Sequence, residues 1–171
     1  MGKPATARES SLLRDLIVVG DFIGNGKDQV LLYDRAAGQG DVVGFNASGR
    51  TNLHTTNTGW RTSWDLITAG RFVGNGRSQI VLYDRTAGHA DVVGFNNVGK
   101  EVNLDTGNDG WLTTWDVMVA GSFIANGRDQ ILLYDRAAGQ ADVLGFNSAG
   151  RSNLDTVNTN LRTSWTSIAV L

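Results

Sequence analysis

The chain has 171 residues and a formal net charge of −2, with 17 acidic and 15 basic side chains scattered along it. Nucleic acids and anionic membranes attract proteins through concentrated positive charge, so neither is expected as the main partner. The absence of cysteine excludes disulfides, thiolate nucleophiles and cysteine-ligated zinc.

Residues 1–13 are interpreted as an N-terminal tail. No apolar stretch that could act as a signal peptide lies between Met1 and Ser11. No later run approaches the roughly 20 apolar residues that a membrane-spanning helix needs. We therefore expect a soluble chain without membrane insertion, and the sequence does not indicate a cellular compartment.

Three near-copies of one unit follow the tail. The tripeptide Tyr-Asp-Arg recurs in register at Tyr33, Tyr83 and Tyr134. Self-similarity at a fixed period is typical of repeat architectures. We place the repeats at 14–63, 64–114 and 115–164, and interpret 165–171 as an extra strand equivalent to the first strand of a fourth repeat.

Four short strands are predicted in each repeat, because segments rich in Val, Ile, Leu, Tyr and Phe alternate with turn signals. In repeat 2 they are Asp65–Phe72, Gln79–Asp84, Asp91–Asn96 and Glu101–Asp105. Between the first two, Asn75-Gly76 predicts a type I′ hairpin turn, in which both central residues have positive φ. No window shows a 3.6-residue apolar period, so the fold class is all-β.

The second and third strands, such as Val30–Tyr33 and Val42–Phe45, are apolar without alternation. Such strands are buried on both faces, which predicts that each sheet is covered by neighbours on either side. Four-stranded antiparallel sheets stacked in this way are the blades of a β-propeller. A β-trefoil also has three units of four strands and is the alternative, although its strands should alternate more.

The segment Asp21–Gln29, DFIGNGKDQ, followed by an apolar strand, resembles the FG-GAP or VCBS repeat of integrin-like propellers and several propeller lectins. The resemblance extends from Asp15 to Trp165. It implies a propeller fold and a role in adhesion, sugar binding or as an accessory domain of secreted enzymes, because the same blade serves all three.

In the resembled family the corresponding loop binds calcium, which needs six to eight oxygen ligands. Here Ile23 and Gln29 occupy ligand positions in repeat 1, and Arg71 and Ser122 replace the leading aspartate in repeats 2 and 3. We therefore expect no metal site and no cofactor.

Enzymatic activity is not expected either. Catalysis needs unlike groups at one place, whereas the repeats supply like groups at three places. His54 and His89 each occur in one repeat only, and both are expected at surface turns. The sequence contains neither a Gly-x-Ser-x-Gly nor a His-Glu-x-x-His motif, and we predict no catalytic residues.

Polar and aromatic residues that a core does not require recur after the second and fourth strands of each repeat. Strand parity places both loops at the same end of an antiparallel sheet. An indole ring suits the C–H face of a sugar, and Asp and Arg suit its hydroxyls. The predicted carbohydrate-binding residues are Asp34, Arg35, Trp60, Arg61, Trp64, Asp84, Arg85, Trp111, Trp115, Asp135, Arg136, Arg162 and Trp165.

The sequence therefore predicts a multivalent carbohydrate-binding protein, a lectin, whose partner is a carbohydrate or glycoconjugate. Two alternatives stay open. One is a protein-binding or structural propeller segment, in which the indoles and the Asp-Arg pairs serve only to join blades. The other is an accessory domain derived from a larger secreted protein. Because propellers close with about four to eight blades, three repeats predict a homodimer that completes a six-bladed ring.

Overall fold

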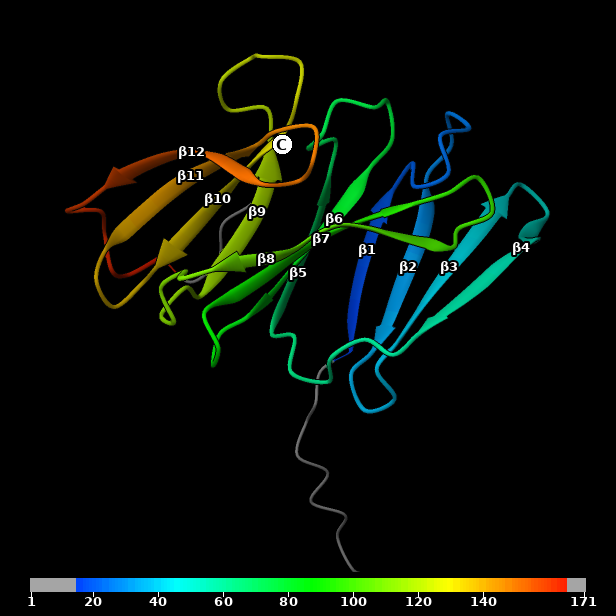
Figure 1. Ribbon diagram of the computed structural model, residues 1–171, viewed down its shortest axis with the longest axis horizontal. Coiled ribbons are helices and arrows are strands. Elements are labelled where there is room, and N and C mark those ends of the chain that lie inside the picture. The colour runs from blue at the N-terminus through cyan, green and yellow to red at the C-terminus, as the bar shows by residue number, and fades with distance from the viewer. Residues whose placement is uncertain (1–14, 166–171) are drawn as a thin grey trace, which may run out of the picture.

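The computed structural model describes residues 15–165, which form twelve β-strands. The strands make three antiparallel sheets of four strands each (Figure 1). This described part of the chain contains no helix, and hence none that could cross a membrane. The predicted tail, 1–13, and all of the predicted extra strand except Trp165 lie outside the described residues.

Each repeat forms one sheet, in which the strands pair in chain order. Sheet 1 contains β1 (Leu16–Gly20), β2 (Gln29–Asp34), β3 (Gln39–Asn46) and β4 (Gly49–Thr58). Sheet 2 contains β5 (Leu66–Gly70), β6 (Gln79–Asp84), β7 (His89–Phe95) and β8 (Glu101–Asp109). Sheet 3 contains β9 (Val117–Gly121), β10 (Gln130–Asp135), β11 (Gln140–Phe146) and β12 (Ser152–Asn158).

The three sheets stand side by side, with sheet 2 in the middle. Strand β5 contacts both β1 and β9, and the last strands of sheets 1 and 3 lie at opposite sides of the molecule (Figure 1). The sheets remain separate over residues 15–165, where they close neither into a ring nor into the barrel that the β-trefoil alternative requires.

Apolar side chains fill both junctions between the sheets. The first junction is a buried cluster of Phe22, Leu31, Tyr33, Val42, Trp64, Ile80, Leu82, Val93 and Phe95. The second contains Phe72, Val73, Val81, Tyr83, Ala90, Val92, Trp115, Met118, Ile131, Leu133, Leu144 and Phe146. Alternate residues of β6 and β7 thus point to opposite clusters, because successive side chains of a strand point to opposite faces.

Burial of the second strand depends on the position of its sheet. All six residues of β6 are buried, as the unbroken apolar pattern predicts. In β2 the burial alternates, and Leu32 is exposed while Leu31 and Tyr33 are buried. Within residues 15–165 the prediction of burial on both faces is wrong for β2, because in this range a neighbouring sheet covers only one face of sheet 1.

The loops between the first two strands of each sheet differ from the predicted type I′ turns. Gly76 has a φ of 78°, but Asn75 has no positive φ. The longer loop between β5 and β6 is held instead by buried Gln79, whose Oε1 accepts the Val73 N–H at 3.1 Å and whose Nε2 donates to Asn75 Oδ1 at 2.8 Å. The same two types of contact are made in all three repeats by Gln29, Gln79 and Gln130.

A fully buried asparagine in β4, Asn57, ties sheet 1 to sheet 2. Its Nδ2 donates to the carbonyl of Gly99 at 3.1 Å, and its Oδ1 accepts the N–H of Glu101 at 2.9 Å. Asn108 in β8 accepts the N–H of Ser152 at 3.3 Å in the equivalent position. The last strand of one sheet therefore binds the turn between the third and fourth strands of the next sheet.

Replacing Asn57 with alanine should lower the free energy of unfolding by about 1–3 kcal/mol, because the buried carbonyl of Gly99 and the partly buried N–H of Glu101 lose a hydrogen-bond partner. Denaturant unfolding measures the change. The control Asn97→Ala alters an exposed side chain of the same turn and should change the free energy by less than about 0.5 kcal/mol. Equal stability of the two variants would contradict the assigned role of Asn57.

Candidate functional site

The turn after the second strand and the loop after the fourth strand meet at one end of every sheet. In sheet 1 the N–H of Trp60 donates to the carbonyl of Gly38 at 3.0 Å. Gly38 has a φ of 61°, and a Cβ there would collide with the Trp60 carbonyl oxygen, so only glycine fits. The same backbone contact joins Trp111 to Gly88 and Leu161 to Gly139.

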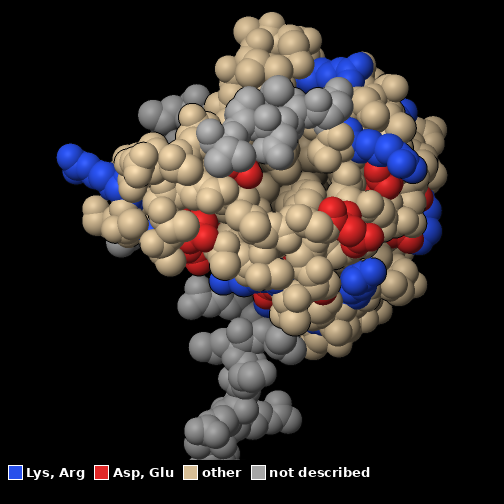
Figure 2. Space-filling model, turned by 60° about the vertical axis from the view of Figure 1, so that its left-hand side comes forward, with Lys and Arg blue, Asp and Glu red and all other residues tan. Residues whose placement is uncertain are grey.

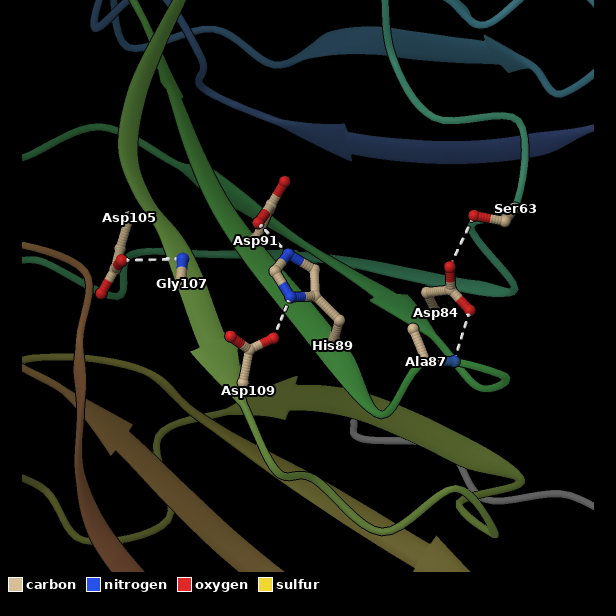
Figure 3. A network of polar contacts seen from close by, with 8 residues as sticks. All are labelled: Ser63, Asp84, Ala87, His89, Asp91, Asp105, Gly107 and Asp109. Carbon is tan, nitrogen blue, oxygen red and sulfur yellow. Dashed lines mark hydrogen bonds and ion pairs between the residues drawn. The ribbon is translucent and has the colours of Figure 1, made fainter.

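The predicted site aspartates hold these turns. Each carboxylate accepts the N–H of the residue three positions later, at 2.9–3.0 Å, in Asp34, Asp84 and Asp135. Asp84 also accepts the Ser63 hydroxyl at 2.5 Å (Figure 3). Burial opposes ionisation of Asp84, but the hydrogen bonds from Ser63 and from the turn outweigh it and lower its pKa. These aspartates are thus engaged by their own loops.

Two of the predicted site arginines, Arg35 and Arg85, reach from one repeat to the next. Arg35 Nη2 lies 3.3 Å from Asp65 Oδ1, and Arg85 Nη1 lies 3.7 Å from Asp116 Oδ1. Asp65 also accepts the backbone N–H of Arg85 at 2.8 Å, and the N–H of Arg136 donates to Asp116 at 2.9 Å. The side chains of Arg35 and Arg85 therefore each pair with an aspartate of the following repeat.

The five tryptophans fall into three environments. Trp64 and Trp115 are almost fully buried, each in the apolar cluster of one junction. Trp60 and Trp111 are half-buried and lie on Tyr33 and Tyr83, with ring centroids 5.8 and 5.7 Å apart. Trp165 is exposed and lies on Tyr134 at 5.7 Å.

A pocket of about 310 Å³ opens at the junction of sheets 1 and 2. It brings together three of the predicted residues, Trp60, Arg61 and Trp64. The Arg61 guanidinium lies 5.6 Å from the centre of the Trp64 ring, within cation–π range. The remaining lining residues are Gly59, Leu82, Asp91, Val93, Glu101, Asn103 and Thr106.

Four polar residues of the pocket, Asp91, Glu101, Asn103 and Thr106, were not predicted from the sequence. Asp91 carried a usable signal, because an aspartate opens the apolar third strand of every repeat, at Asp41, Asp91 and Asp142. Glu101 carried no such signal. Its carboxylate accepts the indole N–H of Trp60, a contact that only the stacking of two sheets creates.

The other predicted residues do not line this pocket. Asp34, Arg35, Asp84 and Arg85 hold or join the loops around the first two sheets, and Trp111, Trp115, Asp135 and Arg136 lie at or beyond the second junction. Arg162 lies near the end of repeat 3 and Trp165 directly follows that repeat, and no sheet follows them within the described residues. The junctions also differ chemically, since Leu112 replaces Arg61 in repeat 2 and Leu161 replaces Trp60 in repeat 3.

His89 lies beside the pocket in β7 and is buried, and His54 lies within β4, so the prediction of a surface turn is wrong for both residues. Its Nε2 lies 2.8 Å from Asp91 Oδ1 and its Nδ1 contacts the Asp109 carboxylate (Figure 3). Its ring stacks on Trp64, with centroids 6.0 Å apart. Burial would lower the pKa of His89, but the hydrogen bonds to Asp109 and Asp91 outweigh burial, and the pKa is raised.

Electrostatic features elsewhere are modest. Acidic and basic side chains are interspersed on the face drawn in Figure 2, most of which is uncharged. Among residues 15–165 no group of three or more His, Cys, Asp and Glu side chains is arranged to hold a metal ion. Asp21, which leads the loop that resembles a calcium site, accepts the N–H groups of Asn25 and Gly26, both at 2.9 Å.

Comparison with known proteins does not assign a family. No protein-family model matches the chain, and a search of curated proteins finds no match.

Replacing His89 with glutamine, the residue at this position in repeats 1 and 3, should destabilise the protein most at mildly acidic pH. A raised pKa in the folded state means that the contribution of protonated His89 is complete below the unfolded value of about 6.5 and is lost as the pH rises through the folded value. Denaturant unfolding of both proteins from about pH 5.5 to 9 tests this. Variant His54→Gln changes an exposed imidazole and is the control. A stability difference independent of pH would contradict the paired role of His89.

Proposed function

We propose that the protein binds carbohydrate in the pocket between sheets 1 and 2, and that its sheets are blades of an FG-GAP or VCBS-type propeller lectin. The observation that carries the proposal is the content of the pocket, which combines indole rings, a guanidinium and two carboxylates around one opening. This combination offers an apolar ring face together with donors and acceptors for hydroxyl groups.

The roles of the aromatic residues differ within this site. Trp64 is almost fully buried, so it supports the site from below and offers little surface to a ligand. Trp60 is half-buried and its indole N–H donates to Glu101, which fixes the ring beside the carboxylate. Trp60 is therefore the proposed platform for the sugar ring.

The polar residues would take the hydroxyl groups. Asp91 and Glu101 provide acceptors, Arg61 provides donors, and the exposed side chains of Asn103 and Thr106 can do both. The volume of about 310 Å³ is at the lower end of the range for small-molecule pockets, about 300–1,000 Å³. A single sugar residue is thus the proposed ligand unit.

Repetition supports multivalent binding. A shallow sugar site of millimolar affinity is worth only about −4 kcal/mol, and linked sites raise the apparent affinity by roughly 10² to 10⁴ without new contacts. The first junction is the proposed principal site, because the second lacks the guanidinium of Arg61 and has Leu112 instead. Binding, and not catalysis, is proposed for each.

A structural role for the repeats is the second candidate. It is favoured by the burial of Trp64 and Trp115 in the junctions and by the bridges from Arg35 and Arg85 to the next repeat. In that case the pocket has no ligand, and the repeats serve only to build a propeller that binds other proteins or supports a larger one.

A glycan array separates the two candidates. The wild type should bind a defined set of glycans, and the double variant Trp60→Ala, Trp111→Ala should lose that binding because the ring platforms are removed. Variants Asn103→Ala and Thr106→Ala alter exposed side chains that line the pocket, so they should weaken binding by about tenfold without disturbing the core.

The control Asn97→Ala, outside the pocket, should bind like the wild type. Circular dichroism of each variant verifies that it is folded. Absence of glycan binding by the wild type, or binding unchanged in all pocket variants, would remove the lectin proposal and leave the structural one.

A further inference from the structure

Sheet 1 presents an apolar face that no described residue covers. The exposed side chains Ile17, Val19, Leu32 and Phe45 belong to it, and they are here called the open face. Soluble monomers seldom leave such a contiguous apolar patch in water, and patches of this kind mark sites of protein association.

The repeats show what this face is built to contact. The counterpart of Leu32, which is 40% exposed, is Leu82 in sheet 2, which is 2% exposed. The counterpart of Phe45, which is 49% exposed, is Phe95, which is 5% exposed. Leu82 and Phe95 are buried because the preceding repeat packs on them, whereas no described repeat packs on Leu32 and Phe45.

Two aromatic contacts make that packing. Phe22 of repeat 1 meets Phe95 edge to face at 5.2 Å, and Phe72 of repeat 2 meets Phe146 at 5.3 Å. The next residue in this series is Phe123 of repeat 3, which is 40% exposed. Phe123 thus has no sheet to receive it among the described residues.

The tryptophans form a second series. Trp64 shares a buried cluster with Leu82, and Trp115 shares one with Leu133. The third member, Trp165, is 41% exposed. Phe123 of repeat 3 and Trp165, which directly follows that repeat, are here called the free edge of repeat 3. Residues 15–165 therefore carry both halves of one junction, and neither half has a partner within this range.

We propose that the free edge of repeat 3 packs on the open face of sheet 1 in a second copy of this chain. Phe123 would lie on Phe45 of the second copy, and Trp165 beside its Leu32. Each copy carries both surfaces, so two copies related by a two-fold axis form two identical seams and leave neither surface open. Two copies give six sheets, within the range of about four to eight at which propellers close, whereas three copies give nine.

Departures from the repeat pattern meet in this seam. A Cβ on Gly24 or Gly74 would lie 2.8 Å from the Nε of Arg77 or Arg128 in the next repeat. The third residue of this series is Ala125, with a φ of 50°, and it would face Lys27 of the second copy. Repeat 3, which alone has a Cβ at this position, would thus meet repeat 1, which alone has a lysine in place of the arginine. The lysine side chain lacks the planar guanidinium of arginine.

The backbone hydrogen bonds between successive repeats also have equivalent donor and acceptor residues across the seam. Ser78 N–H donates to the Asp21 carbonyl at 2.9 Å, and Asp129 N–H donates to the Arg71 carbonyl at 3.1 Å. The next pair in the series is Asp28 of one copy and Ser122 of the other. Asp28 and Phe45 also line a surface pocket of about 160 Å³ on sheet 1, which leaves room beside Phe45 for an entering side chain.

The mass in solution tests the proposal. The wild type should sediment as a single species of twice the 18.3 kDa of one chain at about 50 μM. Variants Phe45→Glu and Phe123→Lys should each be monomeric, because a charge then faces an apolar surface in both seams. The control Val98→Glu, at an exposed turn outside the seam, should stay dimeric.

Mixing the two monomeric variants gives a sharper result. A mixed pair of Phe45→Glu and Phe123→Lys has one unaltered seam and one seam in which the introduced carboxylate faces the introduced ammonium group, so mixing should recover the dimer. Recovery also shows that both variants are folded. A monomeric or trimeric wild type, or a mixture that stays monomeric, would overturn the proposal, and neither result depends on sugar binding.

The cysteine-free sequence allows a second measurement. The double variant Phe45→Cys, Phe123→Cys, treated with a short bifunctional maleimide, should yield a covalent dimer. Each single variant should stay uncrosslinked, because the two copies of one residue lie in different seams. Equal crosslinking of the single and double variants would contradict the arrangement.

Discussion

The stacking of one apolar sheet face on the next is the interaction on which the rest of the structure depends. Sheet 2 shows it complete, because β6 is buried on both faces between two clusters. Burial of apolar surface stabilises by about 25 cal/mol per Å², and no single sheet of four strands can obtain it alone. Polar groups then set the spacing of the sheets, through Asn57 and the Arg35–Asp65 pair.

The pocket is a product of the same stacking. Its aromatic and guanidinium groups come from the loop after β4, whereas its carboxylates, Asp91 and Glu101, come from the facing sheet. His89 sits behind this arrangement and connects Asp91 to Asp109 under the Trp64 ring. The buried His89 imidazole therefore contacts a carboxylate that lines the pocket.

Much of the fold is predictable from the sequence, since the repeat places every sheet. The predicted strand Gln79–Asp84 is observed with the same bounds, and the predicted Asp65–Phe72 is observed as Leu66–Gly70. The Asn75-Gly76 turn is wrong, because Gln79 pairs with the loop and holds it in a longer form. That outcome depends on the buried side-chain amide of Gln79, which a rule based on the two turn residues does not take into account.

Prediction of the residues that line the pocket was partial for a related reason. Trp60, Arg61 and Trp64 are close in sequence and meet in the pocket. Glu101 joins them from 41 residues away through a contact with Trp60. Local pattern identifies the loop, but the residues opposite it follow from how two sheets face each other.

Hydrogen exchange tests the central role of stacking most directly, because β2 and β6 have nearly identical sequences, QVLLYD and QIVLYD. If a second copy covers the open face, the amides of β2 and β6 should be similarly protected in the wild type, and Phe45→Glu should accelerate exchange in β2 and leave β6 slow. Exchange in β2 that is fast in the wild type and unchanged in the variant would contradict the account.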